Sequence, residues 1–146
     1  MISLSVYGEP GEARYAAVWV QRTGAAWVAV HGVDGAGYQS FFNNWTAKGY
    51  APVLVSATGT SHNAIFAAVF EQGIAGAVVA HHGMTSGPES HAGTFQHLNK
   101  VARDQKMILR SFDVYGTSSD RRYIAVWHAN PRFVKWHVHP ADTAAA

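Results

Sequence analysis

Apolar and polar positions alternate with a period of two residues near the start of the chain, which is typical of a half-buried β-strand. Ile2, Leu4 and Val6 share one face of this run, and polar or aromatic residues share the other. Further short apolar runs bounded by turn residues also predict strands. The predicted strands are Ile2–Tyr7, Tyr15–Val20, Trp27–His31, Ala51–Ala57, Ile65–Glu71, Ala77–His82, Ile108–Val114, Arg122–His128 and Val134–His139.

The second predicted strand, Tyr15–Val20, is apolar on both faces. A strand of this kind is normally covered on both sides, so its aromatic residues are expected in the core and not on a ligand-binding surface. The loop to the following strand, Trp27–His31, is short. We therefore expect these two strands to pair as an antiparallel hairpin.

The apolar period changes to that of a helix in two places. The first helix is predicted at Tyr38–Lys48, where aromatic residues fall at i, i+3, i+4 and i+7, and Gly49 ends it in a left-handed conformation. The second helix is predicted at Thr94–Lys106. Each helix follows three predicted strands.

This order of elements recurs along the chain. The run R-Y-A-A-V-W at Arg14–Trp19 returns as I-F-A-A-V-F at Ile65–Phe70 and as R-Y-I-A-V-W at Arg122–Trp127, which are 51 and 57 residues further on. A recurrence at this period predicts a repeat architecture. The longer second period is explained by an insertion in one loop, Gly83–Gly93, and insertions belong in surface loops.

The predicted fold is therefore α+β, with about three repeats of a strand-strand-strand-helix unit, antiparallel sheets and two covering helices. One repeat domain spans residues 1–146, with units at approximately 1–50, 51–107 and 108–146. The third unit stops before a helix. Sheet edges left uncovered by that helix could support homo-oligomers.

The order and spacing of short motifs resemble the bacterial tandem repeat domain family, a repeat that also forms the N-terminal half of fungal polyglycine hydrolases. The residues that carry the resemblance are Tyr15–Trp19, Trp27, His31-Gly32, Tyr38-Gln39, Phe42, Gly49-Tyr50, Val55-Ser56, Gly59, Phe95-Gln96, Tyr123–Trp127, Trp136 and His139. The chain departs from the family pattern at Phe70, where a tryptophan is expected, and at Lys106, where a glycine is expected.

The resemblance implies a repeat fold and a secreted or cell-surface location in bacteria. The hydrolase half of the fungal proteins depends on a Ser-x-x-Lys motif, which this sequence does not contain. Their hydrolytic activity is therefore not implied for this chain. The N-terminal residues show neither a basic region nor a long apolar region, so no signal peptide is expected within the sequence.

The composition of the chain limits the classes of partner and of chemistry that are expected. The formal net charge is +2, and the basic residues are scattered, which gives no electrostatic surface for nucleic acid. No apolar run reaches the length of a membrane span. The chain has no cysteine, which excludes disulfides and thiolate chemistry.

The candidate chemistry centres on three of the nine histidines, His31, His82 and His139, which each lie twelve residues after an aromatic of the repeated strand. Three imidazoles brought together would suit zinc; alternatively, each histidine packs structurally in its own unit, which is the interpretation we favour. A role as a general base or in a ligand contact also remains open.

Further candidate binding residues are Gln39 and Gln96 at the helix starts, and Glu89 and His91 in the inserted loop. A glutamine at a helix start can cap backbone groups. The predicted function is a non-catalytic repeat-type binding or interaction module of an exported bacterial protein, without a cofactor, whose partner is a small molecule, a glycan or a peptide. The alternative is a small hydrolase or metal-binding protein that uses the three repeated histidines.

Overall fold

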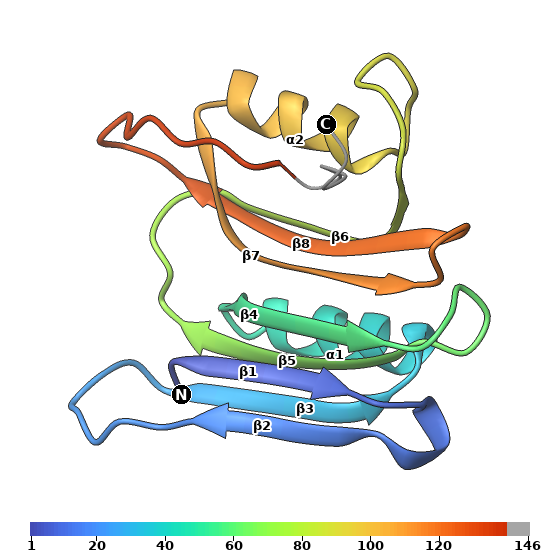
Figure 1. The fold of residues 1–146 in the computed structure, drawn as a ribbon. Helices are drawn as coiled ribbons and strands as arrows, with labels where there is room; N and C mark the ends of the chain where they lie inside the picture. Colours follow the sequence, from blue (N-terminus) through green and yellow to red (C-terminus); the bar gives the residue numbers. More distant parts are fainter. Residues whose placement is uncertain (140–146) are drawn as a thin grey trace.

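The computed structural model describes residues 1–139 of the chain and contains three antiparallel sheets with two α-helices (Figure 1). The strands are β1 Ser3–Tyr7, β2 Arg14–Val18, β3 Trp27–Val33, β4 Tyr50–Thr58, β5 Ile65–Gln72, β6 Val78–Thr85, β7 Met107–Gly116 and β8 Arg121–Ala129. The helices are α1 Gly35–Thr46 and α2 Phe95–Asp104, and a 3-10 turn covers Pro10–Glu12. The predicted α+β class and the repeated units are confirmed.

The strands pair across the predicted sequence units. The first sheet contains β1 and β2, the second has the order β3-β5-β4, and the third has the order β6-β8-β7. The predicted hairpin between the second and third strands is therefore wrong, because β3 pairs with β5 and not with β2. Residues 19–26 separate β2 from β3 and carry the chain from one sheet to the next.

Each complete sheet is one continuous block with the order strand, helix, strand, strand. The block β3-α1-β4-β5 forms the second sheet and its helix, and the block β6-α2-β7-β8 forms the third. By the same order, β1 and β2 are the last two strands of a block. The helix that covers a sheet therefore precedes two of its strands in the sequence.

The predicted strand at Val134–His139 is wrong, since residues 130–139 adopt no strand. Its equivalents in the repeat are β3 and β6. Each of these pairs with the strand two places later in the sequence, β3 with β5 and β6 with β8. Residues 1–139 contain no strand after β8, so this segment has no such partner.

The three sheets stack in chain order, with the first sheet at one end and the third sheet under α2 at the other (Figure 1). One apolar core joins the second sheet to α1 and to the third sheet, and it contains Phe66, Phe70 and Ile124. The other core lies between the third sheet and α2, where the ring of Phe95 stacks on that of Tyr123 at 5.1 Å.

The strands that directly precede the last strand of each sheet in the sequence, β1, β4 and β7, lie side by side along a seam. Ser56 Oγ accepts from the backbone N–H of Val6 at 3.0 Å, and Asp113 Oδ2 accepts from that of Ala57 at 3.0 Å. Ser56 and Asp113 are equivalent positions, 57 residues apart, and so are Val6 and Ala57, 51 apart. A polar side chain at the same repeat position therefore joins the second sheet to the first and the third sheet to the second.

Left-handed backbone recurs where the chain leaves the α1 and α2 helices. Gly49 after α1 has φ 82°, and Lys106, its equivalent after α2, has φ 60°. The carbonyl of each residue accepts a backbone N–H from just beyond the last strand of its sheet, from Gly73 and Asn130 respectively. Lysine adopts this conformation at an energetic cost that glycine avoids.

Candidate functional site

The aromatic stripe of the first sheet is open to solvent. Tyr15 is 38% exposed and Trp19 is 59% exposed. The equivalent aromatics of the other two sheets are almost wholly buried: Phe66 2%, Phe70 0%, Tyr123 0% and Trp127 0%. The prediction that Tyr15–Val20 is covered on both sides is therefore wrong.

The reason is the position of the helices. Phe41 and Phe42 of α1 set their ring edges against Phe70, at centroid distances of 5.2 and 5.9 Å. In the third sheet, Phe95 of α2 stacks on Trp127 at 6.0 Å. The covering helix comes before the strand pair in a block, and no helix precedes β1 in the described chain.

A groove follows from this open stripe. It lies between the first sheet and β3 and has a volume of about 170 Å³. Its lining is almost entirely apolar and consists of Met1, Leu4, Tyr15, Ala17, Trp19, Ala29, Val30 and His31. We call it the first-sheet groove. The outer edge of β2, beside it, carries no strand from residues 1–139.

The repeated histidines pack on the aromatic stripes. The ring of His31 meets Tyr15 edge-on at 4.9 Å, and that of His82 meets Phe66, the equivalent residue, at 5.3 Å. His82 also meets Tyr38 at 5.4 Å. Each of these two histidines therefore links the first strand of one block to the strand pair before it.

The three histidines form no common centre in the structure. His139 lies beside His137, with ring centroids 4.3 Å apart. Within residues 1–139, no group of three or more His, Cys, Asp or Glu side chains is placed to hold a metal ion. Burial, reinforced by nearby His81, lowers the pKa of His82, so its imidazole is held in the neutral form. The described structure therefore does not bring His31, His82 and His139 together as a set of zinc ligands.

The two glutamines at the helix starts do not cap the helices. Gln39 Nε2 donates to Asn43 Oδ1 at 2.9 Å, and Gln96 Oε1 is buried without a hydrogen-bond partner among residues 1–139. The caps are Asp34, which accepts from the backbone N–H of Gly37, and Thr94, which accepts from that of His97. A polar residue directly before each helix is the sequence signal for these caps.

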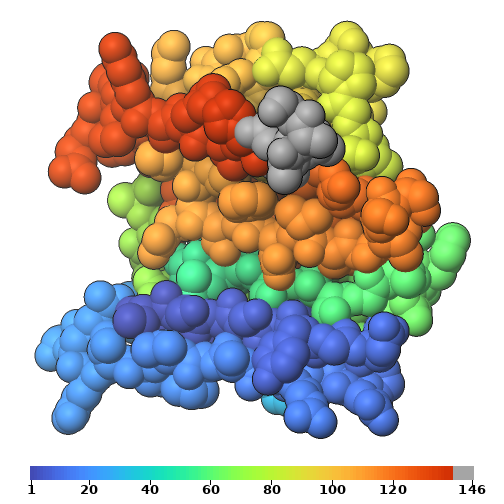
Figure 2. All heavy atoms as spheres, in the orientation of Figure 1, coloured from blue at the N-terminus to red at the C-terminus, as the bar shows by residue number. Residues whose placement is uncertain are grey.

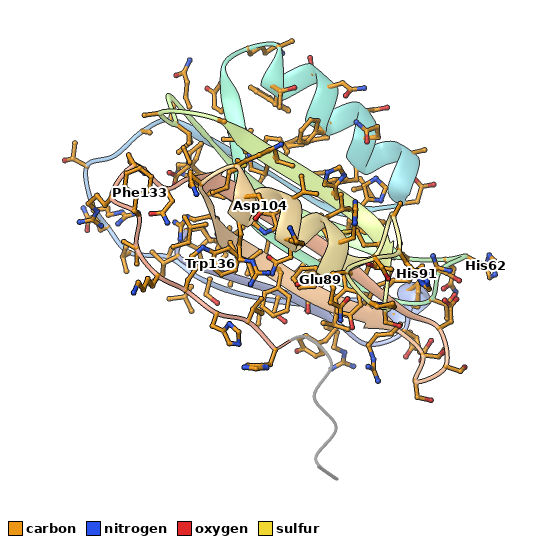
Figure 3. All side chains as sticks on the ribbon, turned by 90° about the horizontal axis from the view of Figure 1, so that it is seen from above. His62, Glu89, His91, Asp104, Phe133 and Trp136 are labelled. Atoms are coloured by element: carbon orange, nitrogen blue, oxygen red, sulfur yellow. The ribbon has the colours of Figure 1, made fainter. Side chains whose placement is uncertain are left out.

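Glu89 and His91 fasten the inserted loop to α2. The carboxylate of Glu89 pairs with Arg103 at 3.1 Å, and its carbonyl lies 2.8 Å from His97 Nδ1. The His91 carbonyl accepts from Thr94 Oγ1 at 2.9 Å. Figure 3 places His91 near one end of the molecule and Phe133 near the other. In this structure Glu89 and His91 hold the inserted loop against α2, and neither residue lines the first-sheet groove.

The groove was missed because the second strand was assigned to the core from its apolar pattern alone. A usable signal lies in the order of elements, since two predicted helices cannot cover three strand pairs when each helix precedes its pair.

Neither helix of the described chain is long and apolar enough to cross a membrane.

Comparison with known families agrees with the block boundaries. A family model described as polyglycine hydrolase-like, structural repeat, matches residues 1–22, 24–73 and 75–130. The second and third matches coincide with the two complete blocks, and the first covers β1 and β2 alone.

Proposed function

Because the chain belongs to the polyglycine hydrolase-like structural repeat family, we propose that it is a non-catalytic binding module that holds an extended polypeptide segment along the open edge of β2. The segment would add a strand to the first sheet and place apolar side chains in the first-sheet groove. The same family resemblance leads us to propose a secreted or cell-surface setting.

The observation that carries this proposal is the difference between the first sheet and the other two. β5 accepts β3 on its outer edge and β8 accepts β6, whereas the equivalent edge of β2 is open in the described chain. Strand addition to an open edge provides affinity through main-chain hydrogen bonds and specificity through alternate side chains. The preferred ligand is thus an extended segment with apolar residues at every second position.

The chemistry of the groove favours a polypeptide over a glycan or a small molecule. Its volume of about 170 Å³ is below the roughly 300–1,000 Å³ that is typical of small-molecule sites. Tyr15, Trp19 and His31 supply the polar side-chain atoms of the lining, and the remainder is aliphatic. This is space for one or two apolar side chains, with few partners for sugar hydroxyls.

Fluorescence anisotropy with labelled peptides tests the proposal. Peptides that alternate valine and threonine should bind, and peptides of the same composition with the valines grouped should bind more weakly. Replacing Trp19 with alanine should weaken binding about 30-fold, because a central buried tryptophan contributes about 2 kcal/mol. Phe133→Ala is the matched control, since Phe133 is an exposed aromatic outside the groove lining.

Two results would overturn this function. Binding that is insensitive to Trp19→Ala would place the ligand elsewhere. Calorimetric binding of oligosaccharides that depends on Trp19, without any binding of peptides, would identify a glycan module instead.

A further inference from the structure

We propose that the chain has a second binding site, for a small aromatic carboxylate, at the end of α2. A pocket of about 420 Å³ lies there, which is within the range that is typical of small-molecule sites. Its lining comes from the end of α2, the start of β7 and the segment after β8. We call it the α2-end pocket. It shares no residue with the first-sheet groove, so this inference is independent of the proposed function.

Two residues with an unusual backbone conformation line this pocket. Among residues 1–139, Lys106 and Phe133 are the two residues other than glycine with a positive φ, at 60° and 50°. Their repeat equivalents, 57 positions earlier, are Gly49 and Gly76, each with φ 82°. The third block therefore has a lysine and a phenylalanine at two positions where the second block has glycine.

This conformation is costly for a residue with a side chain, and glycine avoids the cost. Strained residues of this kind are concentrated at binding and catalytic sites, where the side chain is needed. Lys106 and Phe133 line the same pocket. A joint role of their side chains in binding there accounts for both departures from the repeat.

The α2-end pocket is positively charged. Arg103, Lys106 and Lys135 line it, and no acidic residue does. Arg103 pairs with Glu89 at 3.1 Å, whereas neither lysine forms an ion pair with another residue of the described chain, 1–139. The two lysines are therefore available to an anion.

The neighbouring acidic residue, Asp104, does not compete with such an anion. Its carboxylate pairs with Lys100 on the outer surface of α2, and it is not part of the pocket lining. A ligand carboxylate would thus be the acidic group that completes the pocket.

The neutral polar groups of the lining are already hydrogen-bonded. Trp136 Nε1 donates to the carbonyl of Met107 at 3.1 Å. Asn130 Nδ2 donates to the carbonyl of Val134 at 2.9 Å, and its Oδ1 accepts from the backbone N–H of Val134 at 3.0 Å. The pocket therefore offers charge to a ligand but few partners for hydroxyl groups, which disfavours a sugar.

The remaining lining is apolar and partly open to solvent. Phe133 is 68% exposed and Val134 is 45% exposed. Phe133 and Trp136 lie at the same end of the molecule (Figure 3). Aromatic rings pack favourably on one another, so a ligand ring can lie against these side chains while its carboxylate meets the lysine ammonium groups. This combination is the reason for naming an aromatic carboxylate.

The α2-end pocket and the first-sheet groove lie in different parts of the molecule. In the space-filling view the segment after β8 projects from the third sheet at the upper left, and the first sheet lies at the bottom (Figure 2). A ligand in the α2-end pocket therefore leaves the first-sheet groove open.

Isothermal titration calorimetry with naphthoate tests the site. Naphthamide keeps the two rings without the charge, and acetate keeps the charge without the rings. Naphthoate should bind, and each of the other two compounds should bind at least about tenfold more weakly. Raising the salt from about 20 mM to about 500 mM should weaken naphthoate binding, because the attraction to exposed ammonium groups is screened.

Three variants identify the pocket. Lys106→Gly, Phe133→Gly and Lys135→Gln should each weaken naphthoate binding about tenfold. The two glycine variants should do so without lowering Tm, because they also remove backbone strain. Lys48→Gln is the matched control, since Lys48 lies near the end of α1 and does not line the pocket.

The inference is overturned if naphthoate does not bind, if naphthamide binds as tightly as naphthoate, or if the three variants bind naphthoate like the wild type. Naphthoate binding that is lost in Trp19→Ala and kept in Lys106→Gly would place the ligand in the first-sheet groove, and would also overturn it. Peptide binding at β2 is measured separately, so the proposed function can stand or fail on its own.

Discussion

Replacing Asp113 with alanine should loosen the seam between the second and third sheets. Asp113 Oδ2 accepts from Ser56 Oγ at 2.6 Å and from the Ala57 backbone N–H at 3.0 Å. Ser56 is only 2% exposed, and its Oγ also accepts from the Val6 N–H in the first sheet. One carboxylate is thus the end point of a hydrogen-bond chain that crosses all three sheets.

The expected magnitude follows from these two bonds. A hydrogen bond to a charged group contributes about 1.5–3 kcal/mol, and the partly exposed position of Asp113 lets water replace part of the loss. We expect Asp113→Ala to lower the free energy of unfolding by about 3 kcal/mol, which corresponds to about 10 °C in Tm for a chain of this length. Asp113→Asn retains a neutral acceptor and should cost about 1 kcal/mol.

Urea denaturation followed by circular dichroism measures both variants. Asp104→Ala is the control, since Asp104 pairs with Lys100 on the exposed surface of α2 and its loss should leave the midpoint almost unchanged. The reasoning is refuted if Asp113→Ala costs no more than Asp113→Asn, because the carboxylate would then contribute nothing that a neutral amide cannot.

Three further changes should have measurable effects. Lys106→Gly should raise the free energy of unfolding by about 0.5–1 kcal/mol in chemical denaturation, because it removes left-handed strain that exceeds the added flexibility of glycine; unchanged stability would contradict the strain. Asn99→Ala should cost about 1–3 kcal/mol in the same assay, since it strands the buried indole N–H of Trp127, which now donates to Asn99 Oδ1 at 2.9 Å, and a cost no larger than that of Asp104→Ala would contradict this. Burial lowers the pKa of His82 and His128 below the usual 6.5, so the unfolded chain binds more protons and stability should fall as pH drops below about 6.5; differential scanning calorimetry should show a shallower fall for His82→Gln, and an unchanged slope would exclude its contribution.

The local elements of the fold could be predicted from the sequence, because they follow from local periodicity. Tyr38 and the aromatics after it mark one helix face, and the continuous apolar run that begins at Ile65 marks a strand that the structure places at Ile65–Gln72. The repeat was visible because equivalent residues such as Gly8, Gly59 and Gly116 all need left-handed backbone, with φ of 84°, 98° and 94°.

Strand partners could not be predicted in the same way. Apolar alternation shows which side chains share a face, but it does not show which strand lies alongside. The short connection after β2 therefore suggested a hairpin, although β3 bonds to β5. The same ambiguity hid the groove, since Tyr15 and Trp19 have the sequence of buried residues and lack only the helix that would bury them.

The contiguity of the blocks has a consequence for synthesis. Translation delivers β1 and β2 before β4 and β5, and a two-stranded sheet alone is marginally stable in water. The first sheet contacts β4 and β5, which leave the ribosome about fifty residues later. The second sheet, by contrast, is complete as soon as Gln72 is free, because all its strands come from one stretch of chain. β1 and β2 are thus made before the strands that stabilise them, and in that interval their aromatic side chains have no sheet to pack on.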